Sequence, residues 1–290
     1  MTLSRRMAGY ALLIIPFLVA FGILFWPTFT WMAERFDAHD SFYSHGWLIP
    51  FASSWLVWQR RVRLSQLPSR AGSFWGLALL IPAVIVHVFA SWWGVHFVSG
   101  FAMIAAVWGL VWTAWGPGVL WAIRFPLLFL LFMVPLPGVL LIAISFKMKL
   151  AAAWLASSGL TLLGLPTHQA GSTIQVPGIS VVVDDTCSGL RSLISLIALS
   201  TLWTSLMPPE AKRWQKLSIV AASIPIALAA NMMRIVVLVL LSAIYGPSIA
   251  ESFIHYGSGI VVFGIALIVL AWLSRRLVSS TDVATEPSGS

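Results

Sequence analysis

The chain has 290 residues, of which 59% are hydrophobic and only 9% charged, and its mean hydropathy is +0.93. A soluble domain has about half apolar and about a quarter charged residues, so this composition excludes an ordinary soluble protein and indicates several transmembrane helices. The net charge of +8 is therefore interpreted as a determinant of membrane orientation and not as a nucleic-acid-binding surface, and the single cysteine excludes an internal disulfide.

Apolar stretches predict an all-α integral membrane protein with about eight transmembrane helices. The first stretch is similar to a signal peptide, but it is about 20 residues long and lacks a small-x-small cleavage site, so we expect it to be retained as a span. The polar tail 276–290 is expected to be disordered in the cytoplasm, which leaves 1–275 as one polytopic domain. The predicted spans are 9–29, 46–59, 74–92, 98–116, 119–135, 188–206, 217–244 and 256–274.

One further apolar stretch, 138–165, is predicted not to cross the membrane. Lys147 and Lys149 lie in its first half, and each would cost about 3 kcal/mol at the bilayer centre. The loop that follows the span 188–206 is basic and hence cytoplasmic, so that span begins outside. Because the span 119–135 also ends outside, 138–165 has to leave and return on one face, as an interfacial or re-entrant helix.

Positive charge sets the orientation, because short loops rich in Lys and Arg stay in the cytoplasm. This topology places 12 of the 17 basic residues inside and six of the nine acidic residues outside. The inner basic residues are Arg5, Arg6, Arg60, Arg61, Arg63, Arg70, Arg124, Lys212, Arg213, Lys216, Arg275 and Arg276.

Polar residues are concentrated after 165, on the predicted outer face. "TIQVPGISVVVDD" has β-branched residues on both sides of Pro177-Gly178, which predicts a short periplasmic β-hairpin. The hairpin leads into "DDTCSGLR", which places two aspartates, the only thiol and an arginine within eight positions.

The topology brings Cys187, Arg234 and His255 to this outer face. Cys187 lies where the hairpin becomes a helix, and the unpaired N–H groups and dipole of a helix start favour a thiolate. Arg191 adds positive charge one turn later. Arg234 lies about 17 residues into a span, where an arginine is costly unless it is paired or functional, and Asn231 shares its side of the helix.

A thiol, an imidazole and a guanidinium are sufficient for acyl transfer. Cys187 would attack a peptide carbonyl, His255 would carry the proton, and Arg234 would stabilise the oxyanion. Arg191 is an alternative oxyanion donor or a structural partner of the aspartates. Asp185 has two open roles, either orienting the histidine or binding an arginine. The structural alternatives are a packing cysteine and an interfacial, snorkelling Arg234.

Other chemistries are less well supported by the sequence. The histidines lack metal-ligand spacing, so no metal or cofactor is expected. A serine mechanism of the rhomboid type is disfavoured, because "SSG" at 157–159 lies in the non-crossing helix and "GSG" at 257–259 is too close to His255. His87 lies in the middle of a span and is expected in the core.

Three of these segments resemble motifs of one family. "DDTCSGLRSL" is similar to the nucleophile motif of the exosortase and archaeosortase family of membrane transpeptidases. "NMMRI", which contains Arg234, resembles the family's N-x-x-R element. "HYGSGIVVF" resembles its H-x3-G-x3-F pattern through His255, Gly259 and Phe263.

Two earlier segments extend the resemblance. "YSHGWLIP", which contains His45, resembles the family's H-G-x-L-I-P element, and "MVPLP" resembles its mid-chain proline pair. The five segments occur in the family's order over about 40–275. Many relatives have Glu-Ala where this chain has Asp185-Thr186, so the acid is retained at the same offset.

The resemblance implies a cysteine protease or transpeptidase of the bacterial inner membrane with a periplasmic active site. It implies cleavage of exported proteins at a C-terminal Pro-Glu-Pro-type sorting signal, which an apolar helix and a basic cluster follow. A thioacyl intermediate would then be resolved by water or by an amine. His45 either lines the substrate groove or is structural. The rival hypothesis is a non-enzymatic transporter or polysaccharide-assembly partner, which would need a polar path that few mid-span charges provide.

Overall fold

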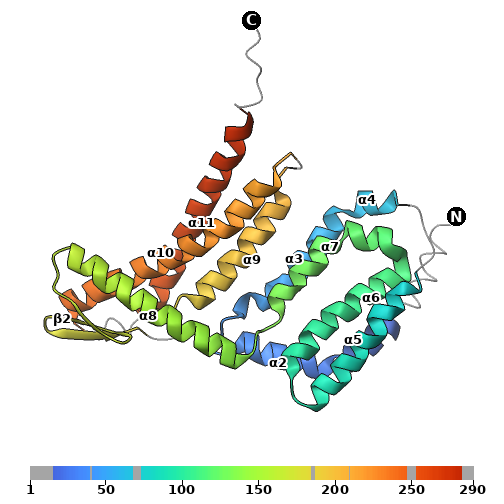
Figure 1. Ribbon diagram of the computed structural model, residues 1–290, viewed down its shortest axis with the longest axis horizontal. Coiled ribbons are helices and arrows are strands. Elements are labelled where there is room, and N and C mark those ends of the chain that lie inside the picture. The colour runs from blue at the N-terminus through green and yellow to red at the C-terminus, as the bar shows by residue number, and fades with distance from the viewer. Residues whose placement is uncertain are drawn as a thin grey trace, which may run out of the picture. The chain divides into compact units, whose positions relative to one another are not determined.

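The computed structural model describes residues 16–39, 41–67, 73–183, 187–208, 210–246 and 253–282, with the side chains of 257–277 in the last helix. The chain is mainly helical and forms two compact units, Met1–Leu136 and Pro137–Ser290 (Figure 1).

The first unit is helical throughout its described residues. A helix over Pro16–Leu24 comes first. The elements that follow are α2 (Trp26–Asp37), the 3₁₀ helix η1 (Ser44–Trp47), α3 (Leu48–Gln59), α4 (Arg61–Ser65), α5 (Trp75–Trp92), α6 (His96–Ala122), α7 (Arg124–Phe129) and the 3₁₀ helix η2 (Leu130–Met133).

A 65° bend separates the helix Pro16–Leu24 from α2. The bend leaves the Leu24 carbonyl without a helical partner, and the Nε2–H group of His87 donates to it at 2.8 Å. Nδ1 of His87 therefore accepts a hydrogen bond from the Ser99 hydroxyl at 2.6 Å, and this hydroxyl also bonds to that of Thr28. His87 is buried, which confirms its predicted place in the core.

Helices α5 and α6 form an antiparallel pair, as predicted for 74–92 and 98–116. The two backbones approach closely at Gly109, where a Cβ atom would lie 2.7 Å from the Leu80 amide nitrogen. Helix α6 breaks at Gly116, which has φ +80°, just before Pro117.

Helix α3 packs against α7 and η2. The Ser53 hydroxyl donates to the Pro126 carbonyl at 2.8 Å. At the far end of α3, Arg60 donates to the Ala122 carbonyl at 2.6 Å. Burial, together with repulsion from Arg63 and Arg124, lowers the pKa of Arg60. Arg60, Arg63 and Arg124 therefore lie close together, as their predicted common cytoplasmic side requires.

The second unit combines helices with a small sheet. Its elements are α8 (Gly138–Leu162), β1 (His168–Ala170), β2 (Thr173–Val176), β3 (Ile179–Val182), α9 (Leu190–Leu206), α10 (Arg213–Tyr245) and α11 (Phe253–Asp282). The strands form an antiparallel meander in the order β1-β2-β3, in which Val176 pairs with Ile179 across the turn. The predicted hairpin is confirmed, and β1 adds a third strand.

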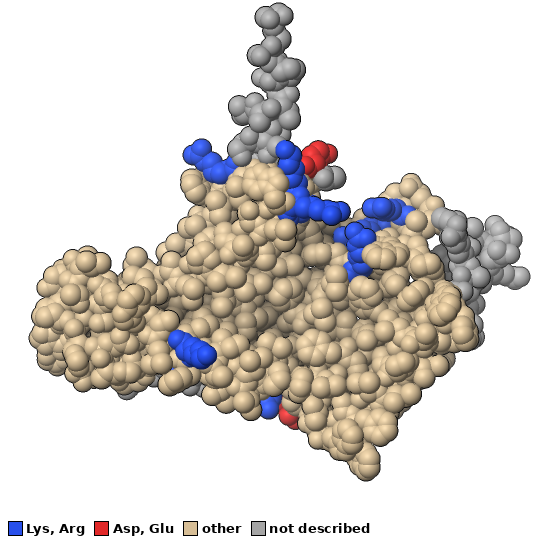
Figure 2. Space-filling model, viewed as in Figure 1, with Lys and Arg blue, Asp and Glu red and all other residues tan. Residues whose placement is uncertain are grey.

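Helix α10 contacts α8, α9 and α11. The Gln215 side chain, near the start of α10, donates to the Leu277 carbonyl near the end of α11 at 2.5 Å. The basic residues at the start of α10 and those at the end of α11 therefore share one end of the unit (Figure 2). These residues are Lys212, Arg213, Lys216, Arg275 and Arg276.

Five helices within the described residues are long and apolar enough to cross a membrane, or six if the bent pair at the N-terminus is one span. These helices support a multi-pass membrane protein, but the predicted number of eight is not confirmed. The five are α5, α6, α8, α10 and residues 257–277 of α11.

Two predicted spans correspond to shorter helices. Helix α3 has 12 residues, or about 18 Å, where a span needs about 30 Å. The stretch 119–135 is divided among the end of α6, α7 and η2. The two segments pack against each other, with Leu56 and Leu127 buried, but α3 also leaves Leu48, Phe51 and Trp58 exposed. The span predicted over 188–206 corresponds to α9, which has 17 residues.

The structure also gives the helix bounds in two other predicted stretches. The stretch 138–165 contains one continuous helix of 25 residues, α8, which is long enough to cross, so its non-crossing path stays a prediction. The predicted boundary between the membrane domain and the tail at 275 falls inside α11, which continues to Asp282.

The close approach of α5 and α6 can be tested with Gly109→Ala. The added methyl group would meet the Leu80 backbone, so we expect a loss of about 1–3 kcal/mol in unfolding free energy and a lower Tm in detergent. Gly118→Ala is the matched control on the same helix, because nothing lies within 4 Å of its Cβ position. Equal melting temperatures for the two variants would contradict the close approach.

Candidate active site

Cys187 lies in a turn between the sheet and α9. Strand pairing extends to Val183, whose N–H donates to the Ser172 carbonyl at 2.9 Å. Helix α9 then begins at Leu190, so the turn is held at both ends. The Cys187 side chain is 5% exposed and packs in a core formed by α8, β2 and α10.

Asn231 of α10 fixes this turn. Its Nδ2–H group donates to the Cys187 carbonyl at 2.8 Å, and both residues are buried. Gly189 has φ +78°, and a Cβ atom there would lie 2.7 Å from Cγ of Asn231. Only glycine fits here, because the backbone is left-handed and Asn231 occupies the space beside it.

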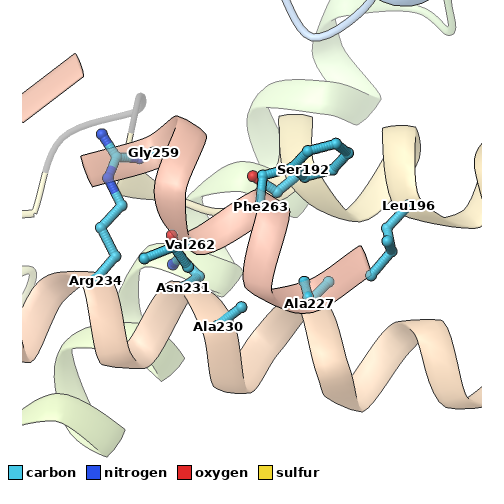
Figure 3. A pocket seen from close by; sticks show the side chains of 10 residues that line it. Ser192, Leu196, Ala227, Ala230, Asn231, Arg234, Gly259, Val262 and Phe263 are labelled. Carbon is cyan, nitrogen blue, oxygen red and sulfur yellow. The ribbon is translucent and has the colours of Figure 1, made fainter. Parts of the chain in front are cut away.

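Arg234 lies one turn after Asn231 on α10, so the two side chains share a side of the helix. Figure 3 shows the Arg234 side chain reaching toward Gly259 of α11. A Cβ atom on Gly259 would lie 3.6 Å from Cζ of Arg234, so the guanidinium packs against the α11 backbone. The absence of a side chain at Gly259 makes room for this contact.

A small pocket lies among α9, α10 and α11 (Figure 3). Its volume is about 10 Å³, enough for roughly one water molecule. Ser192, Asn231 and Arg234 supply its polar lining, while Val262 and Phe263 contribute apolar groups. Asn231 therefore links the pocket to the cysteine turn.

The site lies far from the basic end of the unit. Arg213 begins α10 and Arg234 follows 21 residues later, which places them about 30 Å apart along the helix. This distance is close to the thickness of the hydrocarbon core of a bilayer. If the basic end lies at one membrane interface, Arg234 lies near the other.

The structure describes the other predicted site residues of this unit only in part. Arg191 is the second residue of α9 and is half-buried. His255 belongs to α11, one turn before Gly259, but its side chain lies outside the described residues. Asp185 also lies outside them.

In the first unit, the two early motifs meet. The Leu136 N–H donates to the Tyr43 hydroxyl at 3.3 Å, which joins "YSHGWLIP" to "MVPLP". His45 is half-buried and hydrogen-bonds to the Phe132 backbone. Burial lowers the pKa of His45, and this hydrogen bond opposes the shift in part. His45 is therefore neutral at pH 7.

Sequence reasoning missed several of these relations. Gly189 is not part of any predicted site, although glycine is the residue that most readily adopts the left-handed backbone found there. Ser192, in the pocket, gave no signal beyond its position one turn after the cysteine segment. Within the described part of the chain, no group of three or more His, Cys, Asp or Glu residues could hold a metal ion.

The fold and the site define a multi-pass membrane protein with a buried cysteine whose backbone carbonyl accepts a hydrogen bond from Asn231, one helical turn before Arg234. The family model for transmembrane exosortases matches residues 31–272. The chain therefore belongs to the transmembrane exosortase family. The comparison with curated proteins gives no match, and neither does the comparison with solved structures.

The Asn231 hydrogen bond can be tested through the reactivity of the single thiol. Asn231→Asp replaces the donor with an acceptor, which leaves the buried Cys187 carbonyl without its bond at a cost of about 1–3 kcal/mol. We expect the turn to open more often and a maleimide to label Cys187 about tenfold faster or more. Gln169→Glu, the same chemical change in β1, serves as the control, and equal labelling of both variants would contradict the role of Asn231.

The lowered pKa of His45 predicts a pH-dependent stability. Above pH 6.5, the ordinary pKa of histidine, His45 is neutral in both the folded and the unfolded protein. Its protonation therefore does not reduce the free energy of unfolding in that range. As the pH falls from 6.5 toward the lower folded value, the unfolded state gains the proton first and stability decreases. We expect Tm to fall over this range and to fall less in His45→Gln. An identical pH dependence in the two proteins would rule this out.

Proposed function

We propose that this exosortase family member is a membrane cysteine peptidase or transpeptidase that acts on C-terminal sorting signals of exported proteins. The observation that carries the proposal is that three segments distant in sequence meet within one unit. Asn231 holds the Cys187 turn, and Arg234 of the same helix packs against Gly259, one turn after His255. Family membership supports the reaction class.

The proposed reaction begins with the thiol. His255 accepts the proton of Cys187, and the sulfur attacks the scissile carbonyl carbon. The carbonyl electrons move to oxygen, and the guanidinium of Arg234 stabilises this charge. When the carbonyl reforms, the C–N bond breaks, the leaving amine takes the proton from His255, and a thioester remains on Cys187.

The second half of the reaction resolves this thioester. Water attack gives a carboxylic acid, and attack by an amine gives a new amide bond; each route regenerates the thiol. Asn231 would act as a positioning residue, because it holds the Cys187 backbone and touches no reacting atom. Arg191 remains an alternative oxyanion donor, since it lies one turn after Cys187.

The proposed substrate is a tail with a Pro-Glu-Pro-type motif, an apolar helix and a basic cluster. Such a helix would lie in the bilayer beside this chain, with its own basic cluster on the cytoplasmic side. The distance of about 30 Å between Arg213 and Arg234 would match this tail, because it separates a cytoplasmic basic end from a periplasmic site. We accordingly propose the bacterial inner membrane, with the site on its periplasmic face.

The chemistry can be tested by trapping the acyl intermediate. The full chain is expressed with a tail-bearing substrate and quenched in acid, and the Cys187 peptide is identified by mass spectrometry. We expect the mass of a substrate acyl group on Cys187, and neither the adduct nor processing in Cys187→Ala. Arg234→Lys should slow processing about 100-fold, as expected for loss of an oxyanion donor.

Arg191→Lys is the matched control for the arginine. If it slows processing more than Arg234→Lys does, Arg191 is the oxyanion donor. Undiminished processing by Cys187→Ala, at equal membrane levels of the protein, would exclude the cysteine mechanism.

A further inference from the structure

An apolar groove lies along α2 in the first unit, and none of the residues that line it takes part in the proposed chemistry. We call it the α2 groove; its volume is about 420 Å³. Residues that line it from α2, the η1–α3 segment and η2 include Phe29, Thr30, Ala33, Trp47, Pro50 and Met133. The groove is therefore built partly from the H-G-x-L-I-P and M-V-P-L-P segments.

Two polar side chains of the groove, Thr30 and Trp47, already have hydrogen-bond partners. The Thr30 hydroxyl donates within its own helix, to the carbonyls of Trp26 and Pro27 at 3.1 Å each. The indole N–H of Trp47 donates to Asp37 at 2.9 Å. A ligand in this groove would consequently meet a hydrocarbon surface and would be selected by shape.

The walls of the groove are fixed by packing. The Phe36 and Trp47 rings meet edge to face, with their centroids 5.4 Å apart. Gly46 lies against the Phe36 ring, where a Cβ atom would come within 2.3 Å of the ring. The groove is thus formed before any ligand arrives and does not need a side chain to move aside.

The volume distinguishes between possible occupants. An α-helix with its side chains is about 10–12 Å wide, so 420 Å³ would enclose less than about one turn of it. A flexible hydrocarbon chain is much thinner and fits a groove of this size. Tryptophans such as Trp26 and Trp47 are typical of the depth at which acyl chains meet headgroups.

We propose that the α2 groove binds one acyl chain of a membrane phospholipid. Lipid tails are the solvent around a transmembrane protein, so they are present at high concentration beside the groove. An empty groove would lose dispersion contacts along its walls, and a chain that fills it restores them. This site is independent of the proposed cysteine chemistry.

The proposal can be tested by photolabelling from the lipid. The full chain is reconstituted in vesicles of phosphatidylethanolamine and phosphatidylglycerol with a small fraction of phosphatidylcholine that carries a diazirine in mid-chain. After irradiation, adducts are mapped by mass spectrometry. We expect adducts on Phe29, Thr30 and Ala33 at several times the yield on Val88 of α5, although Val88 is 51% exposed and these three are less so.

Ala33→Trp fills the groove and should reduce these adducts to the level found on α5. Val88→Trp is the matched control and should leave them unchanged. The wild-type labelling pattern decides the question even if Ala33→Trp does not fold. Equal labelling of groove and α5 residues would overturn the proposal, and so would labelling of the groove by a diazirine-bearing apolar helical peptide that excludes the lipid.

Discussion

The hydrogen bond from Asn231 to the Cys187 carbonyl is the constraint on which the rest of the site depends. Cys187 lies between a sheet and a helix, and Asn231 of α10 holds its backbone carbonyl. Gly189 allows Asn231 to reach the turn because it has no side chain. The same α10 face then presents Arg234 to α11. One asparagine thereby sets the position of the Cys187 backbone relative to Arg234.

The second unit is built with its polar groups at two ends. Gln215 joins the start of α10 to the end of α11, so basic residues from both helices share one end. The site residues lie about 30 Å away along α10, with apolar helix between. This separation matches a bilayer, and it explains why an arginine is tolerated on a helix as apolar as α10.

The sequence predicted the long helices well, because α5, α6, α10 and α11 are apolar over a full membrane thickness. The predicted number of eight spans is not confirmed, because α3 and the α7–η2 segment are equally apolar but shorter than a membrane crossing. Hydropathy shows that a segment avoids water, but it does not tell whether lipid or protein covers that segment. The contact between Tyr43 and Leu136 is non-local, so no pattern along the chain could predict it. For the same reason, spacing alone could not give the bond between Asn231 and Cys187.

Helix α8 has a consequence for the surrounding membrane. Lys147 is exposed near the middle of a helix whose other residues are mostly apolar. An ammonium group that faces acyl chains draws water and phosphate headgroups toward it, because hydrating it locally is less costly than dehydrating it. If α8 crosses the membrane, we therefore expect the bilayer to be thinned and dimpled on this flank of the second unit; on the predicted non-crossing path, Lys147 would lie among the headgroups instead. Such a dimple would shorten the path that a polar peptide has to travel from the aqueous phase to the α8 side of the fold.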